Sequence, residues 1–193
     1  MKKFMFIMIA VVAMACTSCH TEGTTSNNPS TEYLSLWKPS TKGISEKAKI
    51  AVERSENTTC PNNDFRYVIH FPKEWKIDYT GTKGKSPKTC MNTVSAFYSP
   101  KANWASCSYF ISHLKQLGFK ETQKPKPGDI VIFFKKNNAP GHAGLYVGNS
   151  LLGPLMNHAD GGNQPYNYEK HLLIEYYMLK HKYYIKYKYY TPI

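Results

Sequence analysis

Residues 127–160, PGDIVIFFKKNNAPGHAGLYVGNSLLGPLMNHAD, contain the pattern that decides the fold class. The run IVIFF at 130–134 is apolar and rich in β-branched and aromatic side chains, which predicts a buried strand. A turn rich in Asn, Pro and Gly follows at 137–141, and residues 142–148 then alternate between apolar side chains and small or polar ones. We therefore expect a hairpin of antiparallel strands, followed by a third strand at 155–160.

Helical patterns precede this predicted meander of strands. Apolar side chains recur at helical spacing in residues 45–54, 90–98 and 103–117. A further strand is predicted at 65–71 from its alternating pattern, and the Tyr- and Lys-rich residues 183–190 predict a terminal strand at a sheet edge. Helices followed by a meander of antiparallel strands predict an α+β fold.

The composition indicates a globular protein with an excess of positive charge. The chain has 193 residues, with 25 Lys and Arg against 13 Asp and Glu, and a formal net charge of +12. An aromatic content of 14% argues against a disordered chain, and the length is sufficient for one packed domain. The only long apolar run lies at the N-terminus, which excludes a polytopic membrane protein. The charge favours acidic envelope polymers and anionic lipid head groups as partners.

Residues 1–19 have the order of a lipoprotein signal peptide. Two lysines precede an apolar stretch that is too short to span a bilayer. A cysteine that follows a small residue then resembles a lipobox, with Cys19 as the expected lipidated residue and Cys16 as the alternative. An ordinary secretory signal peptide is the other interpretation. Both place the mature chain outside the cytoplasm, where nucleic acid is a poor partner. We expect it in the cell envelope, lipid-anchored at the outer membrane on its periplasmic or surface face.

The rest of the chain divides into a linker and a domain. Residues 20–43 are rich in Thr, Ser, Asn, Pro and Gly, and they predict a flexible tether. We expect residues 44–193 to form a single domain that acts as a monomer.

The chemistry that the sequence favours is that of a cysteine nucleophile. The chain has no GxSxG motif, no HExxH motif and no paired CxxC motifs, so we expect neither serine catalysis nor a bound metal or other cofactor. What remains is a cysteine at a helix start, a histidine at a strand start and a polar residue on the next strand. A helix N-terminus and a neighbouring imidazole both lower the pKa of a thiol, and a third polar group orients the imidazole.

The motifs PGDIVIF, GHAGLYVG and MNHADGG together resemble the core of the NlpC/P60 and CHAP families of cysteine peptidoglycan hydrolases. The resemblance covers residues 85–190. It implies a papain-like fold, in which N-terminal helices pack on an antiparallel sheet. It also implies a Cys-His-polar triad that cleaves an amide bond of peptidoglycan, within the stem peptide or at its junction with muramic acid. His142 takes the place of the catalytic base.

Two cysteines are candidates for the nucleophile. Cys90 begins a predicted helix, and its surroundings, CMNTVS, resemble the helix start of related secreted amidases. Cys107 stands in CSYFIS, which also resembles the family signature, but it falls inside the helix predicted at 103–117, where the dipole contributes little. We therefore favour Cys90. The other interpretations of Cys107 are a packed thiol and a disulfide with Cys60.

The third member of the triad is expected on the strand after that of His142. If the chain turns back directly after that strand, His158 and Asp160 lie opposite His142 on one face, and Asn157 has the other parity. We favour His158, then Asp160, then Asn157. Gly144 and the glycine four residues later are expected to leave space beside His142 for a substrate.

These features favour an enzyme that hydrolyses peptidoglycan. A catalytically inactive lipoprotein that binds the wall, a secreted antibacterial amidase toxin and an acyl-transfer enzyme acting on lipids are the alternatives. The aspartate of the Pro-Gly-Asp motif, Asp129, is expected to form a turn rather than to act as an acid.

Overall fold

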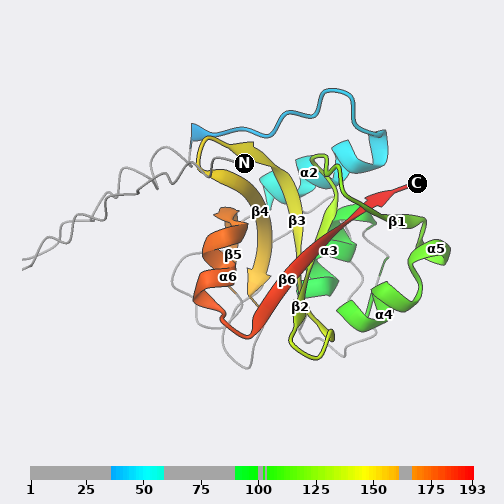
Figure 1. Ribbon diagram of the computed structural model, residues 1–193. Coiled ribbons are helices and arrows are strands. Elements are labelled where there is room, and N and C mark those ends of the chain that lie inside the picture. Colours follow the sequence, from blue (N-terminus) through cyan, green and yellow to red (C-terminus); the bar gives the residue numbers. More distant parts are fainter. Residues whose placement is uncertain (1–35, 59–89, 100–101, 103, 161–166) are drawn as a thin grey trace, which may run out of the picture.

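A computed structural model describes residues 36–58, 90–99, 102, 104–160 and 167–193 (Figure 1). The predicted signal peptide with Cys16 and Cys19, the predicted strand at 65–71 and Cys60 lie outside the described residues. Within the described ranges, no helix is both long enough and apolar enough to cross a membrane.

The fold is α+β and is built on a six-stranded antiparallel sheet with the strand order β1-β6-β2-β3-β4-β5. The strands are β1 Phe119–Thr122, β2 Ile130–Lys135, β3 Pro140–Ser150, β4 Gly153–Asp160, β5 Asn167–Leu173 and β6 Tyr184–Pro192. The described helices are α2 Glu46–Asn57, α3 Cys90–Tyr98, α4 Cys107–Ser112, α5 Leu114–Leu117 and α6 Ile174–Lys180. The predicted hairpin and third strand are therefore confirmed as β2, β3 and β4.

Both faces of the sheet are covered. Helices α2, α3 and α4 contribute to one apolar cluster with Ile130 and Ile132 of β2, and α6 forms a second cluster with Val131 and Phe133 on the other face. Figure 1 shows α6 and α3 on opposite sides of the sheet. Because successive side chains of a strand point to opposite faces, this two-sided burial explains why the sequence of β2 is apolar without interruption.

The C-terminal strand is internal rather than an edge strand, so this prediction was wrong. β6 pairs with β1 on one side and with β2 on the other. Tyr184 and Tyr190 are buried. The short strand β1, which the sequence analysis did not predict, covers the outer side of β6 and becomes one edge of the sheet.

The helix predicted at 103–117 is shorter and interrupted. Ser106 caps α4 by accepting a hydrogen bond from the backbone N–H of Tyr109 at 3.0 Å, so Cys107 is the first residue of a helix. The chain leaves helical geometry at His113, whose Nδ1 atom lies 2.8 Å from the carbonyl oxygen of Tyr109. Side chains that bond to the local backbone in this way compete with the helix. The prediction that Cys107 lies inside a helix was therefore wrong.

The Pro-Gly-Asp motif forms the turn before β2, as predicted. Asp129 is buried and accepts a hydrogen bond from the backbone N–H of Lys126 at 2.8 Å. Gly128 has a φ of 91°, and a Cβ atom at this position would lie 2.6 Å from the Cβ of Ala48 in α2. The hydroxyl of Tyr98 in α3 donates to the carbonyl oxygen of Gly128. The turn thus joins the sheet to α2 and α3.

Candidate active site

Cys90 and His142 meet where the start of α3 lies against β3. Cys90 is 8% exposed and His142 is 4% exposed. The charge and hydrogen bonding of the His142 imidazole and hydrogen bonding by the backbone of Ala143 both lower the pKa of the Cys90 thiol. The sulfur atom is therefore surrounded by protein groups that can exchange a proton with it or stabilise its charge.

Cys107 lies beside Cys90. The two Sγ atoms are 4.0 Å apart, and both residues are buried free thiols. A disulfide bond is about 2.05 Å long, so the two sulfurs are separate groups. Cys107 is part of the main apolar cluster, which matches the interpretation as a packed thiol.

The two thiols differ in their expected charge. The hydrogen bond from Cys107 holds the pKa of Cys90 well below its ordinary value, with further lowering by the charge of His142 and by hydrogen bonds to His142 and Ala143, while burial opposes the change. The hydrogen bond to Cys90, burial and the negative charge of Cys90 raise the pKa of Cys107. Cys90 is therefore the more acidic thiol of the pair. This distinction favours Cys90 as the nucleophile, although both cysteines begin helices.

His158 and Glu169 extend the contacts behind His142. The Nε2 atom of His142 lies 3.0 Å from Nδ1 of His158, and Nε2 of His158 lies 3.3 Å from a carboxylate oxygen of Glu169. His158 and Glu169 are direct partners in the register of β4 and β5. The structure thus brings together Cys90, His142 and His158 and adds a carboxylate behind them.

Aromatic rings from the second apolar cluster surround the two histidines. The ring of Tyr177 in α6 stacks on His142 at a centroid distance of 4.6 Å and contacts His158 edge-on at 5.1 Å. The ring centroids of Phe133 and His142 are 5.7 Å apart. Packing on this face holds the imidazole of His142 in one orientation, and it makes His142 a buried residue rather than one that faces an open side of the sheet.

Asn157, another candidate for the third position, does not approach His142. The amide of Asn157 points to the opposite face, where its Nδ2 donates to Ser55 Oγ at 3.0 Å and to Glu56 Oε1 at 2.7 Å. Its Oδ1 accepts from the backbone N–H of His171 at 2.8 Å. Asp160 is the last residue of β4, and its side chain lies outside the described residues.

The glycines of β3 do not leave room for a substrate, so that expectation was wrong. A Cβ atom at Gly144 would lie 2.8 Å from Sδ of Met156, and one at Gly148 would lie 3.1 Å from the ring of Trp37. The space beside these two glycines is filled by the side chains of Met156 and Trp37.

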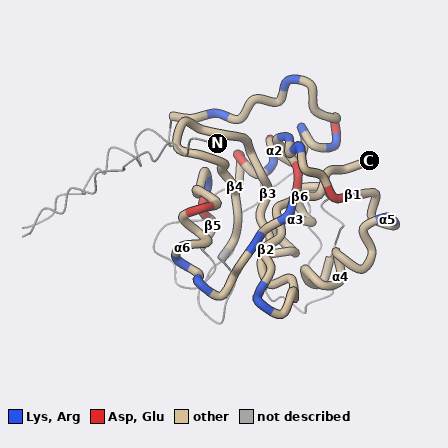
Figure 2. Tube along the Cα trace, viewed as in Figure 1, with Lys and Arg blue, Asp and Glu red and all other residues tan. Residues whose placement is uncertain are grey.

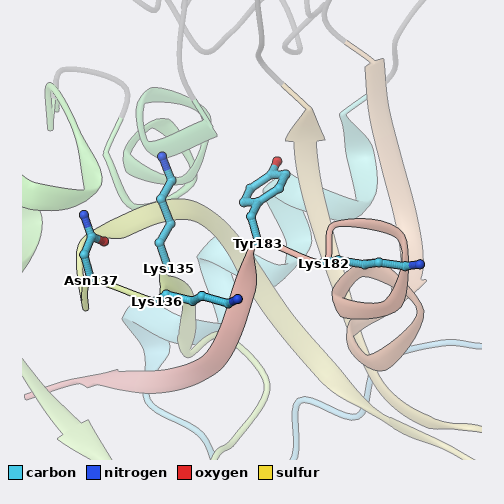
Figure 3. Close-up of a pocket in the computed structure, with 5 residues that line it drawn as sticks. All are labelled: Lys135, Lys136, Asn137, Lys182 and Tyr183. Carbon is cyan, nitrogen blue, oxygen red and sulfur yellow. The ribbon is translucent and has the colours of Figure 1, made fainter.

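A basic pocket lies at the same end of the sheet as His142. It has a volume of about 630 Å³ and is lined by Lys135, Lys136, Asn137, Lys182 and Tyr183. Figure 3 shows these side chains coming from two segments, the β2–β3 hairpin and the turn between α6 and β6. Figure 2 shows Lys and Arg residues gathered at the same two turns.

Gly141 connects the basic pocket to His142. A Cβ atom at Gly141 would lie 2.9 Å from Cε of Lys135 and 2.8 Å from Cε1 of Tyr184. Gly141 directly precedes His142 in the chain, so the lysine side chain and the start of β6 pack beside the backbone that carries the imidazole.

Sequence reasoning missed Glu169 and Tyr177, the groups that contact the histidines from β5 and α6. The segment YEKHLL at 168–173 alternates weakly, and its strand could have been suspected from that alternation alone. Nothing in the Tyr- and Lys-rich tail distinguishes Tyr177 from its neighbours. In the part of the chain that the structure describes, no group of three or more His, Cys, Asp or Glu side chains is placed to hold a metal ion.

Comparisons of the chain with protein-family models, with curated proteins and with solved structures found no match.

Proposed function

We propose that the protein is a cysteine hydrolase of the papain-like NlpC/P60 and CHAP type, which cleaves an amide bond of peptidoglycan. The observation that carries this proposal is the arrangement of Cys90, His142 and His158. Cys90 begins helix α3, and its thiol has a pKa that the imidazole of His142 on β3 helps to lower. That imidazole is hydrogen-bonded to the imidazole of His158 on β4. Helix α3 packs on strand β3 of an antiparallel sheet, which is the kind of packing that the resemblance to papain-like hydrolases implies.

The arrangement supports nucleophilic attack followed by proton transfer to the leaving group. Cys90 transfers its proton to His142, and the thiolate sulfur forms a bond to the carbonyl carbon of the scissile amide. The carbonyl π electrons move to oxygen, where backbone N–H groups at the start of α3 stabilise the negative charge. As the C–N bond breaks, His142 gives its proton to the departing amine, and a thioester on Cys90 remains.

The second half of the reaction restores the thiolate. His142 takes a proton from a water molecule, whose oxygen bonds to the thioester carbon. The C–S bond then breaks and the free carboxylic acid leaves. His158 holds His142 in place throughout, because its Nδ1 atom is bonded to Nε2 of His142 and leaves Nδ1 of His142 for this exchange.

The basic pocket supports an anionic substrate. Three of its five lining residues are lysines, and the chain as a whole has a net charge of +12. Stem peptides of peptidoglycan carry free carboxylates, which ammonium groups attract. The lipoprotein signal peptide that the sequence predicts implies a location in the cell envelope. Peptidoglycan, the proposed substrate, is present there.

The test is digestion of purified sacculi by the full-length protein, with the released fragments identified by mass spectrometry. We expect the wild type and Cys107→Ala to release peptides, and Cys90→Ala to release none. The fragment masses identify the bond that is cut. If Cys107→Ala alone is inactive, the nucleophile assignment is overturned. If the folded wild type leaves sacculi intact but binds them in a salt-sensitive manner, the protein is a wall-binding lipoprotein.

A further inference from the structure

The chain of contacts that leaves Cys90 ends on a carboxylate that is partly exposed to solvent. Glu169 has 31% of its side chain exposed, whereas the His158 side chain is 1% exposed. The carboxylate oxygen lies 3.3 Å from Nε2 of His158, and the Nδ1 atom of that same ring lies 3.0 Å from His142. Both nitrogens of His158 are therefore engaged, one by each neighbour.

A carboxylate determines which nitrogen of His158 carries the proton. Ionised Glu accepts hydrogen bonds and does not donate them, so Nε2 of His158 must be the N–H that faces Glu169. In a neutral imidazole the other nitrogen is then an acceptor. Nδ1 of His158 consequently accepts from Nε2–H of His142.

The tautomer of His158 in turn sets the tautomer of His142. When Nε2 of neutral His142 is the N–H, its Nδ1 is an acceptor that can take the thiol proton of Cys90. The opposite tautomer of His158 would place an N–H against Nε2 of His142 and shift the lone pair of His142 away from the thiol. The carboxylate of Glu169 thus determines which ring nitrogens of His158 and His142 carry the protons, and so leaves an acceptor for the Cys90 thiol.

The carboxylate also compensates the charge that the reaction creates. His142 becomes an imidazolium when it takes the proton of Cys90, and it is almost fully buried. Interactions between charges are stronger in a buried site than in water. A negative charge one imidazole away stabilises that imidazolium.

We infer that Glu169 is a positioning residue of the active site, which acts through His158 to set the tautomer and stabilise the charge of His142. The inference rests on the proposed function for its kinetic consequence. Its structural consequence, the protonation pattern of the two histidines, is independent of any substrate.

The variant that tests this is Glu169→Gln, which keeps the shape of the side chain but removes the charge and adds an N–H donor. We expect kcat on sacculus-derived peptides to fall roughly 10- to 100-fold while KM stays near the wild-type value, as found when groups that orient a catalytic or metal-bound histidine are removed. Glu121→Gln is the matched control, because Glu121 is a surface carboxylate of similar exposure, 39%, that bonds Lys188 of a neighbouring strand at 2.8 Å. It should leave kcat unchanged.

Two readouts need no hydrolase activity. In full-length protein labelled with ¹⁵N-histidine, NMR should show His158 protonated at Nε2 only, and Glu169→Gln should shift the ring nitrogens of both His158 and His142. The rate at which iodoacetamide alkylates Cys90 at neutral pH, followed on the Cys90 peptide by mass spectrometry, should fall in Glu169→Gln and not in Glu121→Gln.

The outcomes separate this inference from the proposed function. If wild type leaves peptidoglycan intact but the NMR and alkylation changes occur, the proposed function fails and the inference holds. Wild-type ring signals and an unchanged alkylation rate in a folded Glu169→Gln variant overturn the inference. If Glu169→Gln does not fold, Glu169→Asp is the test, since it keeps the charge but withdraws it by one methylene group. The same slower alkylation is then expected, and an unchanged rate overturns the inference.

Discussion

Cys90 and Cys107 show how neighbours decide the role of a residue. Both are buried, both begin a helix, and their sulfurs are 4.0 Å apart. The pKa of Cys90 is lowered further by His142 and by the backbone of Ala143, neither of which acts on the pKa of Cys107. Those interactions stabilise a negative charge on one sulfur, so the second thiol serves as its hydrogen-bond donor.

Removal of Cys107 should raise the pKa of the Cys90 thiol. The hydrogen bond from Cys107 is the strongest cause of the lowering, and alanine cannot replace it. Because only the thiolate reacts with iodoacetamide, the pH profile of Cys90 alkylation in Cys107→Ala should move to higher pH than in wild type. Cys107→Ser retains a donor and should lie between the two. A profile for Cys107→Ala that coincides with the wild type would contradict the pairing of the two sulfurs.

Neighbouring residues Asn157 and His158 should respond in opposite ways to replacement by alanine. Asn157→Ala removes hydrogen bonds to Ser55 and Glu56 of α2 and to the backbone of His171, on the face of the sheet that α2 covers. Unsatisfied buried groups cost about 1–3 kcal/mol, so urea unfolding should show a loss of stability of this size. The alkylation rate of Cys90 should stay the same.

His158→Ala should affect activity and alkylation rather than stability. It removes the partner of His142 Nε2, so peptide release from sacculi and alkylation of Cys90 should both slow in a protein that remains folded. Equal effects of the two variants on alkylation would show that the two faces of β4 do not have separate roles.

The Pro-Gly-Asp turn is the element that joins β2 to the helices. Gly128 accepts the hydroxyl of Tyr98 on its carbonyl oxygen, and its N–H donates to the carbonyl oxygen of Tyr146 at 2.8 Å. Its positive φ and its close approach to Ala48 both exclude a larger side chain. The turn therefore sets how near α2 and α3 lie to the strand that precedes His142.

Gly128→Ala should be more destabilising than Gly43→Ala. Both glycines have positive φ angles, 91° and 73°, but a Cβ atom at Gly43 would meet nothing within 4 Å. The control variant thus measures backbone strain alone, about 1–2 kcal/mol, and Gly128→Ala adds overpacking of about 1–3 kcal/mol. Urea unfolding of both variants measures the difference. Equal losses would show that α2 moves away without cost.

At the scale of the whole molecule, the basic pocket lies next to the candidate active site. The β2–β3 hairpin and the turn from α6 to β6 bring three lysines around one pocket, next to the glycine that precedes His142 (Figure 3). These two turns are separated by more than one strand in the chain but are neighbours in the sheet, because β6 inserts beside β2.

Reversal of charge in this pocket should weaken substrate binding. Lys135→Glu should raise KM for acidic stem peptides several-fold and reduce the salt dependence of sacculus binding, because ammonium–carboxylate attraction is screened by salt. Lys120→Glu makes the same change of charge on β1, which pairs with the opposite end of β6, and should have little effect on KM. Equal effects of the two variants would indicate attraction by net charge alone.

The sequence by itself determined the elements whose signal is local. The helix at 90–98 and the strands around 130–134, 142–148 and 155–160 follow from the periodicity of a few adjacent residues, and the structure has each of them. The parity of β4 likewise placed His158 beside His142 and Asn157 on the other face. Side-chain alternation is a property of the chain itself, so it needs no partner to be predicted.

Only the tertiary structure decided the features that depend on distant partners. β6 is internal because β1 pairs with it, and Glu169 reaches His158 because β5 adopts one register against β4. Cys107 lies beside Cys90 because α4 begins at Ser106 rather than earlier. Strand order, register and helix ends are set by the packing of segments far apart in the chain, and no local pattern contains that information.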